Sequence, residues 1–488
     1  MLLSSIRRDW SANPMREMLA GAVATFALIP EVIAFSFAAG VDPEVGLFAS
    51  FVISIVIAFT GGRPAMISAA AGSVALVAAP LVHAHGLPYL FAAGLLAGLL
   101  QIVFGLLRLG VLMRYVSKSV RTGFVNALAI LIFAAQMPHI IGAGWIEYAM
   151  LIAGLVIIYL TPRITTAIPS PLICILILTV ASIAFGLPVL TVADLGKLPD
   201  SLPVFAWPAV PLTLETLRII AGPALAIAMV GLLESMMTAS VVDDLTDTPS
   251  SKNRECTGLG LANAAASLFG GIAGCGMIGQ TVSNVKYGGR GRLSTLFAGA
   301  FLLILTVLLK PWVSEVPVAA LVAIMVMVSI DTFDWSSLRA VIVHPRMSSA
   351  VTVATVLVTV FTANLALGVT VGVLLSGVFF TFKVASLLRV DVAPDQAAGR
   401  LIYRVSGQVF FASADVFVEA FDVQDALGKA VLIDVADAHF WDITAVAALD
   451  KVVQRFAAHG IAVEVAGLNK ASATLIGSLD GKVVLKEV

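Results

Sequence analysis

Long runs of apolar residues, separated by glycine, proline and short polar stretches, dominate the first 389 positions of the chain. The runs repeatedly reach the roughly 17 to 25 residues that a helix needs to cross a bilayer. Hydropathy and the Gly/Pro breaks divide them into about fourteen segments. The pattern therefore predicts an all-α, polytopic membrane protein over most of the chain.

Two of these segments are too short to cross a membrane. One is Ala65–Ala79, which follows Gly61-Gly62-Arg63-Pro64, and the other is Gly276–Val285, which lies between two Gly-Gly pairs. Each is third in its half of seven, and short interrupted segments at matching places mark the binding site of an inverted-repeat transporter. Because seven is odd, the second half enters from the opposite side. We therefore expect two inverted repeats, at about 18–193 and 210–389.

The pattern changes near Val390. Of the 59 charged side chains, 38 precede this position and 21 lie in the last 99 residues, where the apolar runs shorten to strand length. An alternation of strands and helices is typical of a small α/β sheet, so residues 390–488 are predicted to form a soluble domain. The expected elements are strands at Leu401–Val405, Ala430–Val435 and Ile461–Ala466 and a helix at Val446–Ala458.

Composition supports the membrane assignment. Hydrophobic residues make up 59% of the chain and charged residues 12%, about half the charge of a soluble protein. A net charge of -1 and the lack of any Lys or Arg run argue against nucleic acid as a partner. The three cysteines lie in or beside apolar segments and are expected to be buried thiols. No cofactor and no metal site is expected.

Two loops that are rich in Lys and Arg, one after segment four and one after segment ten, predict the orientation of the protein in the membrane. With a cytoplasmic N-terminus, both basic loops fall on the cytoplasmic side, as the positive-inside rule requires, and the C-terminal domain is cytoplasmic too. Residues 1–17 then form a cytoplasmic segment, and Met18–Ala39 is a retained first helix rather than a signal peptide. We expect a multi-pass protein of a bacterial-type inner membrane. The loop residues are Arg108, Arg114, Lys118 and Arg121 after segment four, and Lys286, Arg290 and Arg292 after segment ten.

Two acidic residues, Glu31 and Glu234, lie inside apolar segments one and eight. An ionisable group at membrane depth usually marks an ion or substrate pathway, and a buried carboxyl group near an anion site can carry a proton. Thr238, one turn after Glu234, shares its helix face and could complete a small cation site. We assign the coupling ion, a proton in preference to sodium, to these three residues. The alternative is that both glutamates are structural and hydrogen-bonded.

The two short segments predict an anion site. A half-helix that begins at mid-membrane directs unsatisfied N–H groups and about half a positive charge at what lies there. Small and hydroxyl residues allow close approach of the backbone and add donors, although small residues also serve helix packing alone. The candidates are Gly72 and Ser73 in the first segment and Thr281 and Ser283 in the second.

Three stretches resemble one known family, the SulP anion permeases, which include the sulfate permeases, pendrin and prestin. They are Pro30–Phe35, Gly46–Ser50, and Asn263–Gly274 followed by Thr281–Asn284. The resemblance covers nearly the whole chain. It implies fourteen segments in two inverted repeats, arranged as core and gate domains of the UraA-like fold, with a cytoplasmic STAS domain and a homodimer.

The resemblance also implies a substrate site between helices one, three, eight and ten. It carries over onto Glu31 and Phe35, Gly72 and Ser73, Glu234 and Thr238, and Gln280, Thr281 and Ser283. This chain has Gln280 where many members of the family have arginine. The missing positive charge disfavours a compact dianion such as sulfate and favours a carboxylate or a monoanion.

The C-terminal region resembles STAS domains. Trp441-Asp442-Ile443-Thr444 matches the turn whose hydroxyl is phosphorylated in related anti-sigma-factor antagonists. Here Asp442 and Thr444 are expected to cap the following helix, with phosphorylation of Thr444 as the alternative.

These observations predict a secondary active transporter, not an enzyme, that moves its core against its gate. The preferred function is proton-coupled symport of a carboxylate or dicarboxylate, such as fumarate or succinate. A transporter or exchanger of bicarbonate, sulfate or chloride comes next. A nucleobase:proton symporter, a channel and a membrane sensor that signals through its STAS domain stay open.

Overall fold

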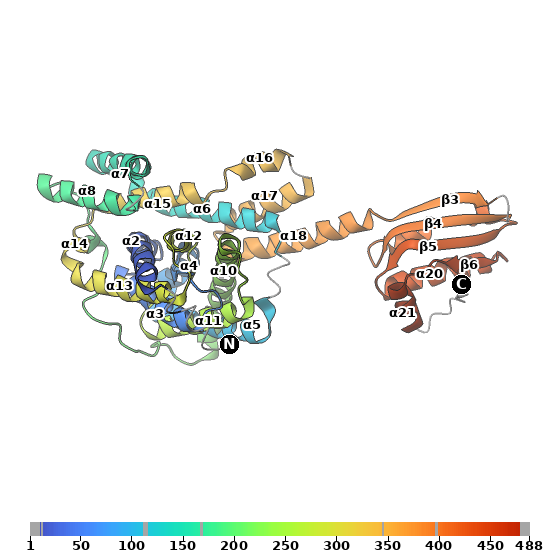
Figure 1. Cartoon of the computed structure of the whole chain (residues 1–488), viewed down its shortest axis with the longest axis horizontal. Helices are drawn as coiled ribbons and strands as arrows, with labels where there is room; N and C mark the ends of the chain where they lie inside the picture. Colours follow the sequence, from blue (N-terminus) through green and yellow to red (C-terminus); the bar gives the residue numbers. More distant parts are fainter. Residues whose placement is uncertain are drawn as a thin grey trace. The chain divides into compact units, whose positions relative to one another are not determined.

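The computed structural model describes residues 10, 13–110, 116–165, 169–343, 346–395 and 399–478 (Figure 1). Arg114 and most of the predicted N-terminal segment 1–17 lie outside these residues. The chain divides into two units, residues 1–373 and 374–488. The first is almost entirely helical, and the second contains a four-stranded sheet.

The first half of the helical unit begins where Asn13 caps a helix through Arg16 N, with Pro14 at its first position. Its elements are α2 (Pro14–Ala38), α3 (Pro43–Thr60), β1 (Ser68–Ala70), α4 (Gly72–His85), α5 (Leu87–Leu106), α6 (Lys118–Ile140), α7 (Trp145–Ile164), α8 (Ser170–Phe185) and α9 (Val192–Leu195). The second half comprises α10 (Leu214–Thr246), α11 (Lys252–Leu268), β2 (Gly274–Gly276), α12 (Ile278–Lys286), α13 (Arg292–Leu308), α14 (Lys310–Ser314), α15 (Val318–Thr332), α16 (Ser336–Val343), α17 (Arg346–Thr362) and α18 (Leu365–Ala385).

Among the described residues, eight helical spans are long and apolar enough to cross a bilayer, and four apolar helices are shorter. The four are α4, α8, α13 and α17. With α11 and the strand and helix β2–α12, they complete the expected fourteen segments in two sets of seven. The polytopic helical membrane fold is therefore confirmed.

The packing of the helices repeats between the two halves. Helix α2 packs on α13 as its counterpart α10 packs on α5, and α3 packs on α13 as α11 packs on α5. Likewise α6 packs on α17 as α15 packs on α7. Three elements contact their own counterparts in the other half: β1 contacts β2, α3 contacts α11, and α6 contacts α15. Each of these contacts has its partner when the halves are exchanged, which is the pattern of two related repeats.

Two groups of helices share this unit (Figure 1). One group, which we call the core, contains α2 to α5 and α10 to α13; the other, the gate, contains α6 to α8, α15 to α17 and the first part of α18, up to Val373. The two short segments cross inside the core.

These segments differ from the expected half-helices in one respect: each begins as an extended strand. β1 and β2 pair antiparallel, with Ala69 opposite Cys275 at the centre. The two strands lie so close together that a Cβ atom added at Gly274 would overlap the carbonyl oxygen of Ala69. Glycine at this position therefore allows the close crossing. Helices α4 and α12 start directly after the strands, so both helix N-termini lie inside the core.

Side chains from the flanking helices complete the hydrogen bonds of the crossing backbone, as a non-helical segment at membrane depth requires. Ser54 Oγ donates to Ser68 O at 2.7 Å, and Gly276 N donates to Ser235 Oγ at 2.9 Å. Asn263 bonds Gly274 twice, through N at 2.9 Å and O at 3.1 Å. The crossing is therefore built into the core and is not a loose loop.

The second unit has the sheet order β3-β4-β5-β6, with β3 and β4 antiparallel and the remaining pairs parallel. Asp442 caps α20 through Ala445 N at 2.8 Å, as expected, whereas Thr444 is exposed on the first turn. Its elements are β3 (Arg389–Asp395), β4 (Arg400–Val409), α19 (Ala414–Glu419), η2 (Gln424–Ala426), β5 (Ala430–Phe440), α20 (Ile443–Ala457), β6 (Val463–Ala466) and α21 (Lys470–Ser478).

Candidate functional site: a cavity at two helix N-termini

A cavity of about 510 Å³ lies where the core faces the gate. Its core side is formed by α2, α10 and the beginnings of α4 and α12, and its gate side by α6, α8 and α15. Seven of the nine residues predicted for the site line it: Glu31, Phe35, Gly72, Ser73, Glu234, Gln280 and Ser283. Residues from helices one, three, eight and ten, which are distant in sequence, therefore meet at one place.

The N-termini of α4 and α12 contribute positive electrostatic potential to this cavity. Neither helix has a side chain that caps it, so the first N–H groups of each stay available to a ligand. Gly72 opens α4 and lies against the ring of Phe35, since an added Cβ would come within 2.7 Å of that ring. The glycine therefore lets the aromatic ring and the helix end share one wall of the cavity.

Glu234 of α10 lies at the beginning of α4. Its Oε2 accepts hydrogen bonds from the Ser73 hydroxyl and from the Cys275 thiol, the latter at 3.1 Å. The protein's own carboxylate therefore already occupies a donor at the end of α4. A second anion that approaches this helix end competes with Glu234 for the Ser73 hydroxyl.

Glu31 lies at the other helix end. The Gln280 side chain on the first turn of α12 hydrogen-bonds the Glu31 carboxylate. Each membrane-embedded glutamate is thus paired with a neutral donor from the N-terminus of a short helix. The two arrangements match under the exchange of the repeats.

Thr238 and Thr281 lie outside the residues that line the cavity. Thr238 Oγ1 donates to Gly276 O at 2.8 Å and to Glu234 O at 2.9 Å. Thr281 Oγ1 accepts from Ile67 N at 3.0 Å. Both hydroxyls bind the crossing backbone, and neither residue lines the cavity.

Several neighbours of the site were not predicted from the sequence. Cys275 was expected only to be buried, but its thiol contacts Glu234; Asn263 was noted only for its family motif, yet it joins β2 to Gln101 of α5 at 2.9 Å. On the gate side, Phe124 and Asp331 line the cavity. An acid at the end of an apolar helix, such as Asp331, could have been predicted to lie at the site from the sequence. Cys275 and Phe124 could not, because apolar residues are common throughout this sequence.

The cavity lining contains three acids, Glu31, Glu234 and Asp331, and no lysine, arginine or histidine among the described residues. An anion in this cavity therefore meets helix ends and neutral donors, with carboxyl groups close by. Such a cavity binds an anion best when a carboxyl group carries a proton.

Core and gate touch at one end of the cavity. At the end of α2, the ring of Phe37 lies 4.4 Å from that of His139 at the end of α6. Asp331 lines the cavity from the end of α15, and nearby, within the gate, Asp334 N donates to Asn126 Oδ1 at 2.8 Å.

Inverted helical repeats with a cavity at the N-termini of two short, interrupted helices are the arrangement typical of a membrane transporter. The description of the sulfate permease family matches residues 15–150 and 143–355, and that of the STAS domain matches residues 391–480. The chain belongs to the sulfate permease family and carries a C-terminal STAS domain. It is an anion transporter and not an enzyme.

Relatives agree over nearly the whole length. The putative sulfate transporter YbaR of Bacillus subtilis is 52% identical over 472 residues, which cover 97% of this chain and 98% of YbaR. The bicarbonate transporter BicA of Picosynechococcus is 27% identical and covers 91% of this chain and 86% of BicA. The structure of murine Slc26a9 shares the fold, with a TM-score of 0.85 at 17% identity over 98% of this chain and 89% of that one.

The close crossing of the strands leads to a first prediction. Gly274→Ala is expected to destabilise the core by about 3 kcal/mol, because the added methyl group overlaps the Ala69 carbonyl and cannot be relieved by a rotamer change. Gly377→Ala in α18 is the matched control, since a Cβ there meets no atom within 4 Å apart from its own helix and chain neighbours. Thermal unfolding in detergent measures both. Equal melting temperatures would show that the strands do not need their close approach.

Proposed function

We propose that the protein is a proton-coupled symporter of a small carboxylate or dicarboxylate of the fumarate and succinate class. The observation that carries the proposal is the composition of the cavity: two helix N-termini and neutral donors, three carboxyl groups and no cationic side chain among the described lining residues. Proton coupling suits such a cavity, because protonation of a carboxyl group removes a negative charge that would repel the anion. The cavity's volume of about 510 Å³ accommodates a small organic anion.

In this mechanism, Glu234 is the coupling residue. While it is ionised, its carboxylate holds the Ser73 hydroxyl and repels an incoming anion. Protonation removes that charge and frees the helix end, so that proton and anion bind together and cross together. Glu31 acts in the same way through Gln280 at the end of α12, and the proton is preferred to sodium as the coupling ion.

Bicarbonate is the second candidate cargo. It is a monoanion with a carboxylate group, which suits a site without a full positive charge, and the relative BicA is named for its transport. Sulfate, suggested by the name of YbaR, is less well suited because its two charges lie on one compact group, whereas a dicarboxylate carries them on two separate groups, and three carboxyl groups but no counter-charge line the described cavity.

We further propose that the protein works as a homodimer in a bacterial-type inner membrane with both termini cytoplasmic. The orientation is supported by basic residues that gather where α2 begins: Glu17 of α2 accepts from Arg290 N at 2.7 Å, and Arg292 donates to Gly61 O at 2.9 Å. The homodimer rests on the family resemblance alone. The STAS domain would then serve assembly or regulation.

The coupling role gives the second prediction. A proton that moves down one pH unit supplies about 1.4 kcal/mol, enough for about a tenfold accumulation at zero membrane potential. Proteoliposomes with the native protein should accumulate labelled fumarate to this extent, whereas Glu234→Gln should bring it only to equilibrium. Glu215→Gln, an exposed change on the same helix, is the control. Uptake by Glu234→Gln that still follows the pH gradient would remove Glu234 from the coupling role.

The missing cation in the cavity gives the third prediction. Gln280→Arg is expected to improve competition by sulfate against fumarate by about tenfold, because a guanidinium binds an oxyanion through two parallel hydrogen bonds. Gln280→Met, similar in size but uncharged, should not favour sulfate. Inhibition of fumarate uptake by a sulfate series measures the shift. An unchanged order of anions in Gln280→Arg would mean that residue 280 does not contact the cargo.

A further inference from the structure

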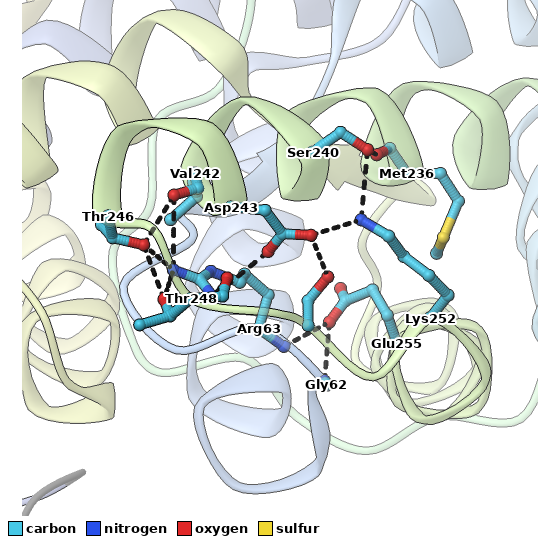
Figure 2. Close-up of polar contacts among 11 residues, drawn as sticks. Gly62, Arg63, Met236, Ser240, Val242, Asp243, Thr246, Thr248, Lys252 and Glu255 are labelled. Atoms are coloured by element: carbon cyan, nitrogen blue, oxygen red, sulfur yellow. Dashed lines mark hydrogen bonds and ion pairs between the residues drawn. The ribbon is translucent and has the colours of Figure 1, made fainter.

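A charged cluster lies at the end of α10, away from the cavity, on the turn that leads into β1 (Figure 2). The Arg63 guanidinium of this turn binds the end of α10: it pairs with Asp243 at 3.2 Å and donates to Thr248 O and Thr248 Oγ1, both at 2.9 Å. It also contacts Thr246 Oγ1 and Val242 O. A cation at this position complements the negative end of the helix dipole. Arg63 therefore fastens the turn to the helix that carries Glu234.

The backbone of the same turn is held by an acid. Glu255 of α11 accepts from Gly62 N at 2.7 Å and from Arg63 N at 3.1 Å, and it is fully buried (Figure 2). Asp243 also pairs with Lys252 at 3.0 Å. If Arg63 is replaced by a neutral residue, Asp243 keeps this partner, so the change does not leave an unpaired buried acid.

Two residues after Arg63 the backbone is strained. Ala65 adopts a φ of +64°, in the left-handed region that only glycine occupies readily, and it is 1% exposed. Its N–H donates to Gly291 O at 3.0 Å, and its carbonyl accepts from Asn284 Nδ2 of α12 at 2.8 Å. The strained turn thus lies between Arg63 on one side and the helix of Gln280 on the other.

The second repeat enters its strand without a left-handed residue other than glycine. The left-handed residue before β2 is Gly270, with a φ of +73°, and it belongs to the Gly-Gly pair that follows α11, as Gly61-Gly62 follows α3. Phe269 N and Gly271 N donate to backbone carbonyls of Ala265 and Ala266, and no charged side chain among the described residues bonds to this turn. Of the two turns, the charged cluster therefore accompanies the one that contains a left-handed alanine.

We propose that Arg63 is a positioning residue for the anion site. By fastening the turn to α10, it holds Ala65 in its left-handed conformation and keeps β1 in register with β2. That register brings Ser73 and Cys275 together on Glu234. The inference concerns the geometry of the site and does not depend on which anion is carried.

The test uses the full-length protein and two readouts. Arg63→Gln should speed hydrogen exchange of the amides of residues 67–70 by about tenfold and raise the KM for fumarate about as much, with a smaller effect on kcat. Arg254→Gln is the matched control, because among the described residues Arg254 donates to the carbonyls of Phe59 and Thr60 and not to α10. Adding Ala65→Gly to Arg63→Gln should restore both values, since glycine needs no external hold at this φ.

Each result decides the proposal. If Arg63→Gln behaves as Arg254→Gln does, or if adding Ala65→Gly to Arg63→Gln does not restore the exchange of residues 67–70, Arg63 is not a positioning residue. If Arg63→Gln does not fold, Arg63→Lys with and without Ala65→Gly gives the same comparison, because lysine keeps the charge but not the forked contacts. Hydrogen exchange is measured without cargo, so this readout tests the role of Arg63 even if the protein does not transport fumarate.

Discussion

The antiparallel pairing of β1 and β2 inside the core is the constraint on which the rest of the membrane unit depends. Two extended segments at membrane depth must find partners for every N–H and C=O, and no water is available to supply them. The surrounding helices meet this need with Ser54, Ser235, Thr238 and Asn263. Once these bonds are made, α4 and α12 can only start at the crossing, which fixes both helix N-termini at the cavity.

The same crossing gives a cavity with positive potential although its described lining has no cationic side chain. The backbone supplies this potential through the two helix ends, and the glutamates supply ionisable groups beside them. In the proposed mechanism, Glu31 and Glu234 each share a donor with the cargo, so the protonation of the glutamates and the binding of the anion would be linked. Selectivity would then depend on the neutral residues Ser73 and Gln280.

Much of this could be predicted from the sequence, because a bilayer enforces simple rules. Segment length, the matching breaks at Gly61-Gly62 and Gly270-Gly271, and two acids in apolar runs predict the repeats and most of the cavity. The strands could not be predicted, since Ser68–Ala70 and Gly274–Gly276 are extended only because each pairs with the other, far away in the sequence. Thr238 and Thr281 show the same limit: helical spacing places them near the site, but only the structure shows that their hydroxyls bind backbone.

The anion is predicted to bind between the N-termini of α4 and α12. A structure determined by electron cryomicroscopy with saturating fumarate at low pH should show density between the N-termini of α4 and α12, in contact with Ser73 and Gln280. The Glu234 carboxyl group should have moved away from the Ser73 hydroxyl. Density elsewhere, with the Ser73 and Glu234 pair unchanged, would contradict the account.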